Sequence, residues 1–256
     1  MNLLLKKLGI LYLMLLSIAY AQAEVEQIQT DIDNGAYALA ANISAPTAIE
    51  LYPNNPQAHY LYAFSLYLVN KIQEARAELA VALSLDTDYS SQYQHLNGLL
   101  FAAEGDTYLA RQELKAAFKN DPNYEYAMDW ARVAWQSEHF DEAIEAFKLA
   151  SQTEKGKIEG WPLLNIGRIL HKQADYDAAI SAFKKAIQLF DAKDNSYSRN
   201  FLPSPGYVET FYQLGQIYEE LGDVKRAKAY YNSAKNSDPD LEAASIALKR
   251  LENTAP

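Results

Sequence analysis

The chain has 256 residues, of which 49% are hydrophobic, and its 33 acidic and 23 basic side chains give a formal net charge of −10. Binding along nucleic acid phosphates or on anionic lipid needs clustered positive charge, and lysines and arginines scattered among acids exclude both. The sequence has no cysteine, which excludes disulfides, thiol chemistry and lipid attachment at a cysteine.

The first 23 residues have the pattern of a cleavable secretory signal peptide. Lys6 and Lys7 precede a 13-residue apolar run over residues 8–20. Ala21 and Ala23 are small residues at the two positions that a signal peptidase recognises. We therefore expect cleavage after Ala23 and a periplasmic or secreted protein. Because a membrane-spanning helix needs roughly 20 apolar residues, an uncleaved inner-membrane anchor is the weaker alternative. Cleavage would remove two lysines and no acids, leaving a net charge of −12.

Residues 24–55 are expected to form an atypical pair of helices. Ile28 and Ile32 share one face of the first helix, and Ala41 and Ala48 share one face of the second. Pro46 lies inside that second helix, where its missing N–H and its ring should kink or split the helix. The first unit of a repeat array often departs from the repeat because one of its faces meets water, so we expect residues 24–55 to cap the array that follows.

A trio of small residues, spaced 12 and 7 apart, recurs five times between residues 56 and 241. The middle members are separated by 35, 33, 36 and 48 residues, which gives an underlying period of about 34. Four residues after each middle member comes a large apolar side chain. Small residues let two helices approach closely, and the large one fills the groove between them. The trios are Ala63/Ala75/Ala82, Gly98/Ala110/Ala117, Ala131/Ala143/Ala150, Gly167/Ala179/Ala186 and Gly215/Ala227/Ala234, and the large residues are Leu79, Leu114, Phe147, Phe183 and Tyr231.

At these positions the chain resembles the tetratricopeptide repeat (TPR) family, whose helix pairs carry small residues at the same three places and a large one between them. Pro122 and Pro239 match its helix-ending proline, and Gly105, Asp175 and Gly222 lie in its turn between helices. The resemblance implies an all-α fold, a right-handed α-solenoid of antiparallel helix pairs. It also implies five repeats over residues 56–241 and a degenerate first unit over residues 24–55. We expect one cooperative domain.

Residues 194–207 hold a 14-residue surplus over the repeat period. Two prolines and a glycine should keep this insertion from extending the preceding helix. It is either a tolerated loop or a loop that covers the binding groove with Tyr197, Phe201 and Tyr207. Residues 240–256 are then expected to form a capping helix, which runs through Leu251, and a short tail.

The sequence contains no motif of a catalytic, cofactor or metal site. It lacks a phosphate-binding glycine loop and a His-Glu-x-x-His pattern, and its four histidines belong to different units. Ser181 and Lys184 form an isolated Ser-x-x-Lys pair on a helix surface, a weak signal for chemistry. We therefore expect neither enzymatic activity nor a cofactor. An enzyme would need titratable groups that converge in a closed pocket.

In TPR proteins the first helix of each unit lines a concave groove, and the resemblance carries this role onto the matching positions here. Arg132 and Arg168 hold the same place in successive units, where they could grip a carboxylate, while aromatic residues receive apolar side chains of an extended segment or helix. Alternatively, both arginines pair with acids such as Glu125, Asp129 or Glu159, and the aromatic residues pack within the array. The predicted partner-binding residues are Tyr60, Phe64, Tyr67, His95, Leu99, Arg132, Trp135, Asn165, Arg168, His171 and Tyr212.

The sequence thus predicts a non-catalytic scaffold of the bacterial envelope that docks a protein or peptide partner. Nucleic acid is not an expected partner, and stable membrane insertion is not expected once the leader is removed. The alternative is a structural subunit of an envelope assembly, such as polysaccharide export, pilus or outer-membrane machinery. The lysine-asparagine clamp of chaperone-binding family members is not expected, because Tyr60 and Phe64 occupy its first places.

Overall fold

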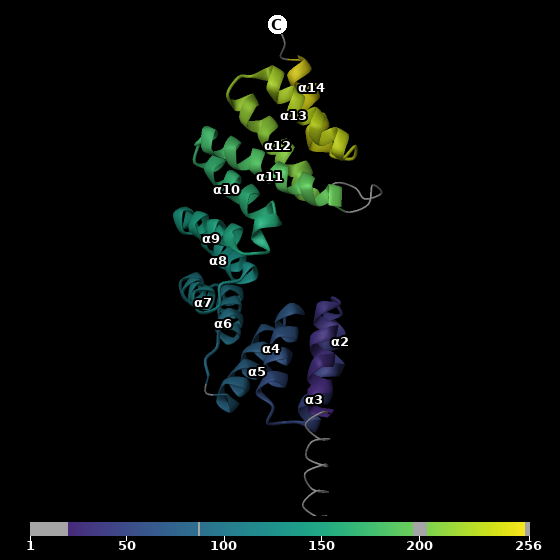
Figure 1. Ribbon diagram of the computed structural model, residues 1–256, viewed down its shortest axis with the longest axis vertical. Helices are drawn as coiled ribbons and strands as arrows, with labels where there is room; N and C mark the ends of the chain where they lie inside the picture. Colours follow the sequence, from purple (N-terminus) through teal and green to yellow (C-terminus); the bar gives the residue numbers. More distant parts are fainter. Residues whose placement is uncertain (1–19, 87, 197–203, 254–256) are drawn as a thin grey trace, which may run out of the picture. The chain divides into compact units, whose positions relative to one another are not determined.

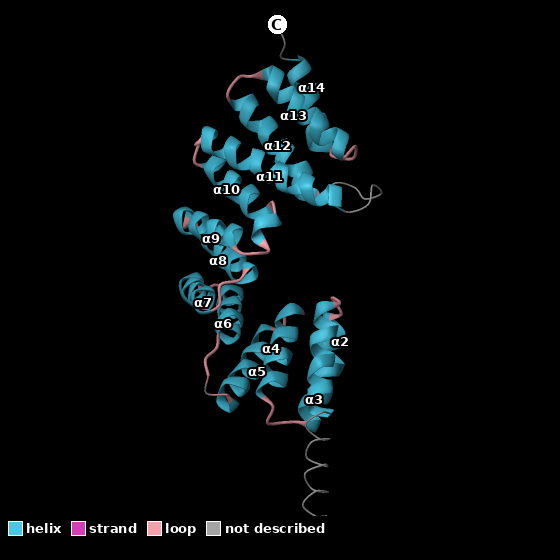
Figure 2. Ribbon diagram, in the orientation of Figure 1, coloured by secondary structure: helices cyan, strands magenta, loops and turns pink. Residues whose placement is uncertain are grey.

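The computed structural model describes residues 20–86, 88–196 and 204–253, and these residues form helices and loops without any strand (Figures 1 and 2). The fold is the predicted all-α solenoid of helix pairs. The chain divides after Asp121 into two compact units, residues 1–121 and 122–256, where the sequence predicted one domain. Each pair of a repeat array contacts mainly its neighbours, so a single core need not run through the whole chain.

The described residues of the first unit form three helix pairs, which share a core that contains Ile28, Leu61 and Leu96. Helical residues 20–33 are followed by a broken second helix. Two regular pairs come next, α4 with α5 and α6 with α7 (Figure 1). The elements are α2 (Tyr37–Leu39), η1 (Ala40–Ser44), α3 (Ala45–Leu51), α4 (Pro56–Leu68), α5 (Ile72–Leu85), α6 (Ser91–Glu104) and α7 (Thr107–Asn120).

The second helix of the first pair is irregular next to Pro46, as predicted. A five-residue π-helical segment, η1, separates α2 from α3, and Pro46 is the second residue of α3, directly after the π-helical turn. The wider π turn places Ala40 and Ala45, five residues apart, on the same fully buried side. The Ser44 hydroxyl donates a hydrogen bond to the Asp31 carboxylate and so ties this segment to the preceding helix.

The second unit begins with the pair α8 and α9 and continues through two further pairs to a final single helix. That helix, α14, packs against α13 and buries Ala244, Ala247 and Leu251, where the sequence places a capping helix. The elements are α8 (Tyr124–Gln136), α9 (Phe140–Gln152), η2 (Gly156–Ile158), α10 (Trp161–Lys172), α11 (Tyr176–Ser196), α12 (Pro205–Glu220), α13 (Val224–Ser237) and α14 (Glu242–Asn253).

The trios of small residues set the distance between the helices of each pair. All fifteen of these residues are buried. A Cβ atom added to Gly167 would lie 2.5 Å from the Phe183 ring, and one added to Gly215 would lie 2.5 Å from the Tyr231 ring. In these repeats the large side chain therefore fills the space that glycine leaves on the facing helix, as the spacing predicts.

The tight turns between paired helices combine a positive φ with an aspartate cap. Gly105 and Gly222 have φ of 89° and 76°, a left-handed conformation that glycine adopts without steric cost. The next residue, Asp106 or Asp223, accepts a backbone N–H of the following helix at 3.0 or 2.9 Å. Ala174 adopts the same conformation, with φ of 59°, despite its Cβ atom.

Both ends of the predicted 14-residue insertion are helical, although the sequence predicted that it would not extend the preceding helix. Residues 194–196 belong to α11 and residues 205–207 to α12, because Pro205 fits the first turn of a helix and Ser204 caps it by accepting the Tyr207 N–H at 3.2 Å. Tyr207 thus packs on Phe211 within α12, with 4.8 Å between ring centroids. Residues 197–203 lie outside the described residues, as do residues 1–19 of the predicted leader.

Candidate partner-binding surface

The candidate residues of the first unit begin with a row of aromatic rings along α4. Tyr60 stacks on Phe64 and Phe64 on Tyr67, each with 6.3 Å between ring centroids, since the spacings of four and three residues place them on one helical face. Tyr93 of α6 meets Tyr60 edge to face at 5.5 Å. Phe64 and Tyr67 are partly exposed, whereas Tyr60 is buried.

His95 and Leu99 on α6 are also buried. Tyr60 packs against the next repeat through Tyr93, which is the alternative that the sequence left open for the aromatic residues. This arrangement leaves Phe64 and Tyr67 as the candidates of this unit whose side chains reach solvent.

Arg168 contacts residues of both neighbouring repeats in the second unit. Its guanidinium lies over the Trp135 ring of α8 at 5.0 Å, and its Nε atom forms an ion pair with Glu209 of α12 at 3.3 Å. Asn165, one turn earlier on α10, accepts a hydrogen bond from Arg168 at 3.3 Å. Residues of three successive first helices, α8, α10 and α12, are thereby linked side chain to side chain.

Arg132 has a different environment from Arg168. Its guanidinium donates to Asp129 at 2.8 Å on the same helix, α8. The two arginines therefore have separate acidic partners, one local and one from another repeat. The pairing with Asp129, given above as the alternative, is present for Arg132, whereas Arg168 pairs with Glu209, which is not among the acids that the sequence suggested for it.

His171 lies one turn beyond Arg168 on α10 and connects to the same neighbouring helix. Its Nε2 atom is 3.0 Å from a Glu220 carboxylate oxygen, and its Nδ1 atom is 3.4 Å from the Gln213 amide oxygen. Glu220 also holds the Tyr176 hydroxyl, and this hydrogen bond raises the pKa of Tyr176. The α10 face thus presents histidine and arginine to acids of α12.

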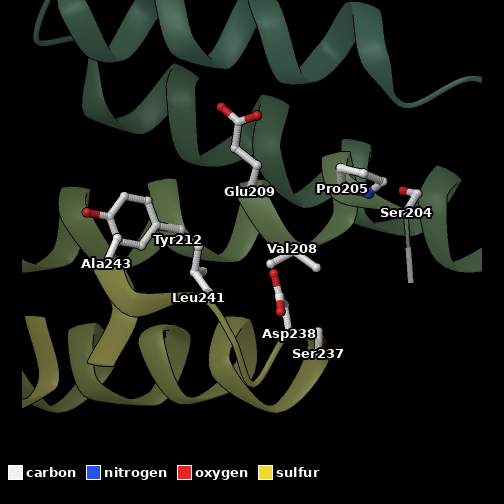
Figure 3. A pocket seen from close by; sticks show the side chains of 9 residues that line it. All are labelled: Ser204, Pro205, Val208, Glu209, Tyr212, Ser237, Asp238, Leu241 and Ala243. Carbon is white, nitrogen blue, oxygen red and sulfur yellow. The ribbon is translucent and has the colours of Figure 1, made fainter. Parts of the chain in front are cut away.

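Tyr212 lies at a cavity of about 610 Å³ between α12 and the segment that joins α13 to α14 (Figure 3). Val208 and Leu241 supply apolar walls, and the carboxylates of Glu209 and Asp238 are the charged groups in its lining. Of this set, only Tyr212 is among the predicted partner-binding residues. Val208 could have been found from the sequence, because it lies four residues before Tyr212 and therefore on the same helical face.

Tyr212 packs against a tyrosine whose hydroxyl is part of a hydrogen-bonded network. Tyr212 packs on Tyr231 at 5.5 Å between ring centroids, and the Tyr231 hydroxyl donates to Glu219 at 2.7 Å. Arg250 of α14 donates twice to the same carboxylate, at 2.9 and 2.7 Å. The hydrogen bonds from Arg250, and to a smaller extent from Tyr231, lower the pKa of Glu219. Burial raises the pKa of Tyr231. The carboxylate stays ionised and ties α12 to α13 and α14.

Metal sites and membrane-spanning helices are both absent from the parts of the chain that the structure describes. Over these residues, no group of three or more His, Asp or Glu side chains could hold a metal ion. Within the same ranges, no helix is both long and apolar enough to cross a membrane.

Comparison with known protein families identifies the helix pairs of this chain. Tetratricopeptide repeat models match residues 95–155 and, separately, residues 162–192 and 208–241. These segments cover four of the five repeats predicted from the small-residue trios. The chain is therefore a tetratricopeptide repeat protein, and TPR proteins are in general scaffolds for protein interactions.

Several solved structures share the fold at low sequence identity. PilW, described as a widely conserved type IV pilus biogenesis factor, aligns with a TM-score of 0.68 at 15% identity over 91% of this chain and 98% of its own. PilF of Pseudomonas aeruginosa aligns with a TM-score of 0.66 at 16% identity, over 93% and 99%. YrrB, described as a TPR protein with an unusual peptide-binding site, aligns with a TM-score of 0.60 at 19% identity, over 80% and 97%.

Proposed function

We propose that this protein is a non-catalytic scaffold of the bacterial envelope that docks an extended segment or a helix of a protein partner on the first-helix face of residues 122–256. The observation that carries this function is the chain of contacts from Trp135 through Arg168 to Glu209, which links three successive repeats through partly exposed side chains. Tyr212 and its cavity lie beside Glu209 and offer an apolar pocket.

The side chains of this face suit a ligand with mixed chemistry. Arg168 is held in place by a ring and two oxygen acceptors, so little conformational entropy is lost when it binds a carboxylate. Trp135 and Tyr212 supply aromatic area with few rotatable bonds. The cavity beside Tyr212 accepts an apolar side chain of the same segment.

Two observations favour the envelope. The first 23 residues have the charge, the apolar run and the small residues of a secretory leader. PilW and PilF also align over almost their whole length with this chain. The alignment with PilW and PilF also favours the alternative function, that of a structural subunit in a pilus-type envelope assembly.

The docking face is tested by photo-cross-linking in cells. A photoreactive amino acid replaces Tyr212, and a matched chain carries it at Val224, which is exposed on α13. We expect a discrete adduct from position 212, reduced about tenfold by Arg132→Ala with Arg168→Ala, because a lost charge-assisted hydrogen bond costs about 1.5 kcal/mol or more. Both ion pairs are partly exposed, so the thermal midpoint should hardly change.

Equal adducts from positions 212 and 224, or an adduct that the double substitution leaves unchanged, would contradict docking on this face. The structural-subunit role predicts a different pattern. In that case the adducts arise from helix surfaces away from α10 and α12, and the protein migrates with a stable envelope complex.

A further inference from the structure

The dipeptide Asn-Gly occurs twice in the chain, as Asn34-Gly35 and as Asn97-Gly98. Asparagine is a chemically labile residue, because the backbone nitrogen of the next residue attacks the carbon of its side-chain amide. Glycine in the next position favours this attack, since it has no side chain to shield its nitrogen. The two copies have different surroundings, and the fold leaves one of them open to the reaction.

The copy on α6, Asn97-Gly98, is protected. The Asn97 amide oxygen accepts a hydrogen bond from Arg76 at 3.0 Å, and its amide nitrogen donates to the Tyr89 hydroxyl at 2.8 Å. Gly98 is buried in the middle of α6, and a Cβ atom added to it would lie 2.7 Å from the Leu114 side chain. Its N–H belongs to a packed helix, so the reaction there requires local unfolding of α6.

The other copy, Asn34-Gly35, lies in the turn between helical residues 20–33 and α2, and both of its residues are exposed. The Asn34 side chain makes no hydrogen bond to any residue that the structure describes. A Cβ atom added to Gly35 would meet nothing within 4 Å, so there is space for a ring to form. The Gly35 N–H donates to the Ile32 carbonyl at 3.0 Å, in the last turn of the helix, where fraying breaks it at low cost.

We propose that Asn34 is a site of spontaneous deamidation, with water as the second reactant. The Gly35 backbone nitrogen bonds to the Asn34 side-chain carbon, and its proton leaves with the amide group as ammonia, which closes a succinimide ring. Water then opens the ring at either carbonyl group. The product at position 34 is an aspartate, or an isoaspartate in which the main chain continues through the former side chain.

Either product changes the turn that joins the two helices of the first pair. The new carboxylate lies beside Asp33 at the C-terminal end of helical residues 20–33, where the helix dipole disfavours a negative charge. The isoaspartate also lengthens the main chain within the turn that the Ala36 N–H closes by donating to the Asp31 carbonyl at 2.8 Å. Because ammonia is lost, the change is irreversible and accumulates with the age of the molecule.

Ageing of the purified full chain at mildly alkaline pH tests the assignment. A glutamate-specific protease then releases residues 27–50, which contain Asn34, and residues 79–104, which contain Asn97. Mass spectrometry with fragmentation locates the replacement of an amide by a carboxylate in each peptide. We expect Asn34 to react at least about tenfold faster than Asn97, because the middle of a packed helix opens far more rarely than a frayed end.

Two controls separate the effect of the fold from that of the dipeptide. In urea that unfolds the chain, the two asparagines should react at similar rates. Asn34→Gln keeps an amide but closes a ring much more slowly, so the acidic species that anion exchange resolves in the aged parent protein should not accumulate. Equal rates at the two sites in the folded chain would overturn the proposal. An Asn34 that stays intact, a difference that persists in urea, or the same acidic species from Asn34→Gln would overturn it too.

Discussion

At the residue scale, the glycines of the first small position show how closely the helices of a pair approach. Gly215 faces Tyr231, whose side chain is fully buried and whose hydroxyl is held by Glu219 at 2.7 Å. The ring therefore has no room to retreat from an added methyl group. In the first repeat the same two places hold Ala63 and Leu79, a larger residue opposite a smaller one.

Gly215→Ala should lower the free energy of unfolding by about 1–2 kcal/mol. The overpacking against Tyr231, typically about 1–3 kcal/mol, exceeds the gain of up to about 1 kcal/mol in helix propensity. Urea unfolding followed by circular dichroism measures the change. Adding Tyr231→Leu, which copies the first repeat, should cost less than the sum of the two single changes. An unchanged or raised stability of Gly215→Ala would show that the ring can move.

At the scale of the element, helix starts differ in how their free N–H groups are satisfied. The Asn55 side chain accepts the N–H groups of Gln57 and Ala58, at 3.0 and 3.1 Å, where α4 begins. Ser90 holds the same position before α6, but its buried hydroxyl has no hydrogen-bond partner among the described residues. One residue thus stabilises its helix and the other leaves a buried polar atom unsatisfied.

Asn55→Ala should therefore cost about 1 kcal/mol of stability. Ser90→Ala, the matched removal of a polar side chain from a helix start, should leave stability unchanged or raise it slightly. Thermal unfolding of the two variants beside the parent protein compares them directly. Equal losses from both substitutions would contradict the difference in capping.

At the scale of the whole molecule, the division after Asp121 determines how far a local change spreads. Each unit has its own buried clusters, with Leu61 and Leu96 in one and Leu214 and Tyr231 in the other. In an array stabilised by neighbouring contacts, a defect in one repeat weakens mainly the repeats beside it.

Gly215→Ala should accordingly raise amide hydrogen exchange across residues 122–256 and leave the exchange of residues 20–121 unchanged. Hydrogen exchange measured peptide by peptide with mass spectrometry follows both units in one sample. The same substitution made in the first unit, Gly98→Ala, where the Leu114 side chain lies 2.7 Å from the added atom, should reverse the pattern. A uniform increase over both units would indicate one cooperative domain, as the sequence predicted.

The helix pairs could be predicted from the sequence because small and large residues recur at fixed spacing, and Pro46 gave the break in the first pair. The register derived from the trios also put Arg168 and Trp135 among the groove residues, and the structure brings the two together. The ion pair with Glu209 could not be predicted, since it depends on side chains 41 positions apart whose rotamers are set by packing. Burial of Tyr60 and His95 was missed for a related reason: a helical face turns inward or outward according to what the next repeat places against it.

Glu209 gives the candidate surface a built-in competitor. Its carboxylate already contacts the guanidinium that an incoming carboxylate would bind, so the incoming group must exchange with it. A ligand with a single charge and no further contacts would gain little from this exchange, whereas a carboxylate that engages two guanidinium N–H groups while an apolar neighbour enters the cavity beside Tyr212 would gain more. In such a site selectivity arises from the exchange itself, and free amino acids or small organic acids would be rejected in favour of longer segments.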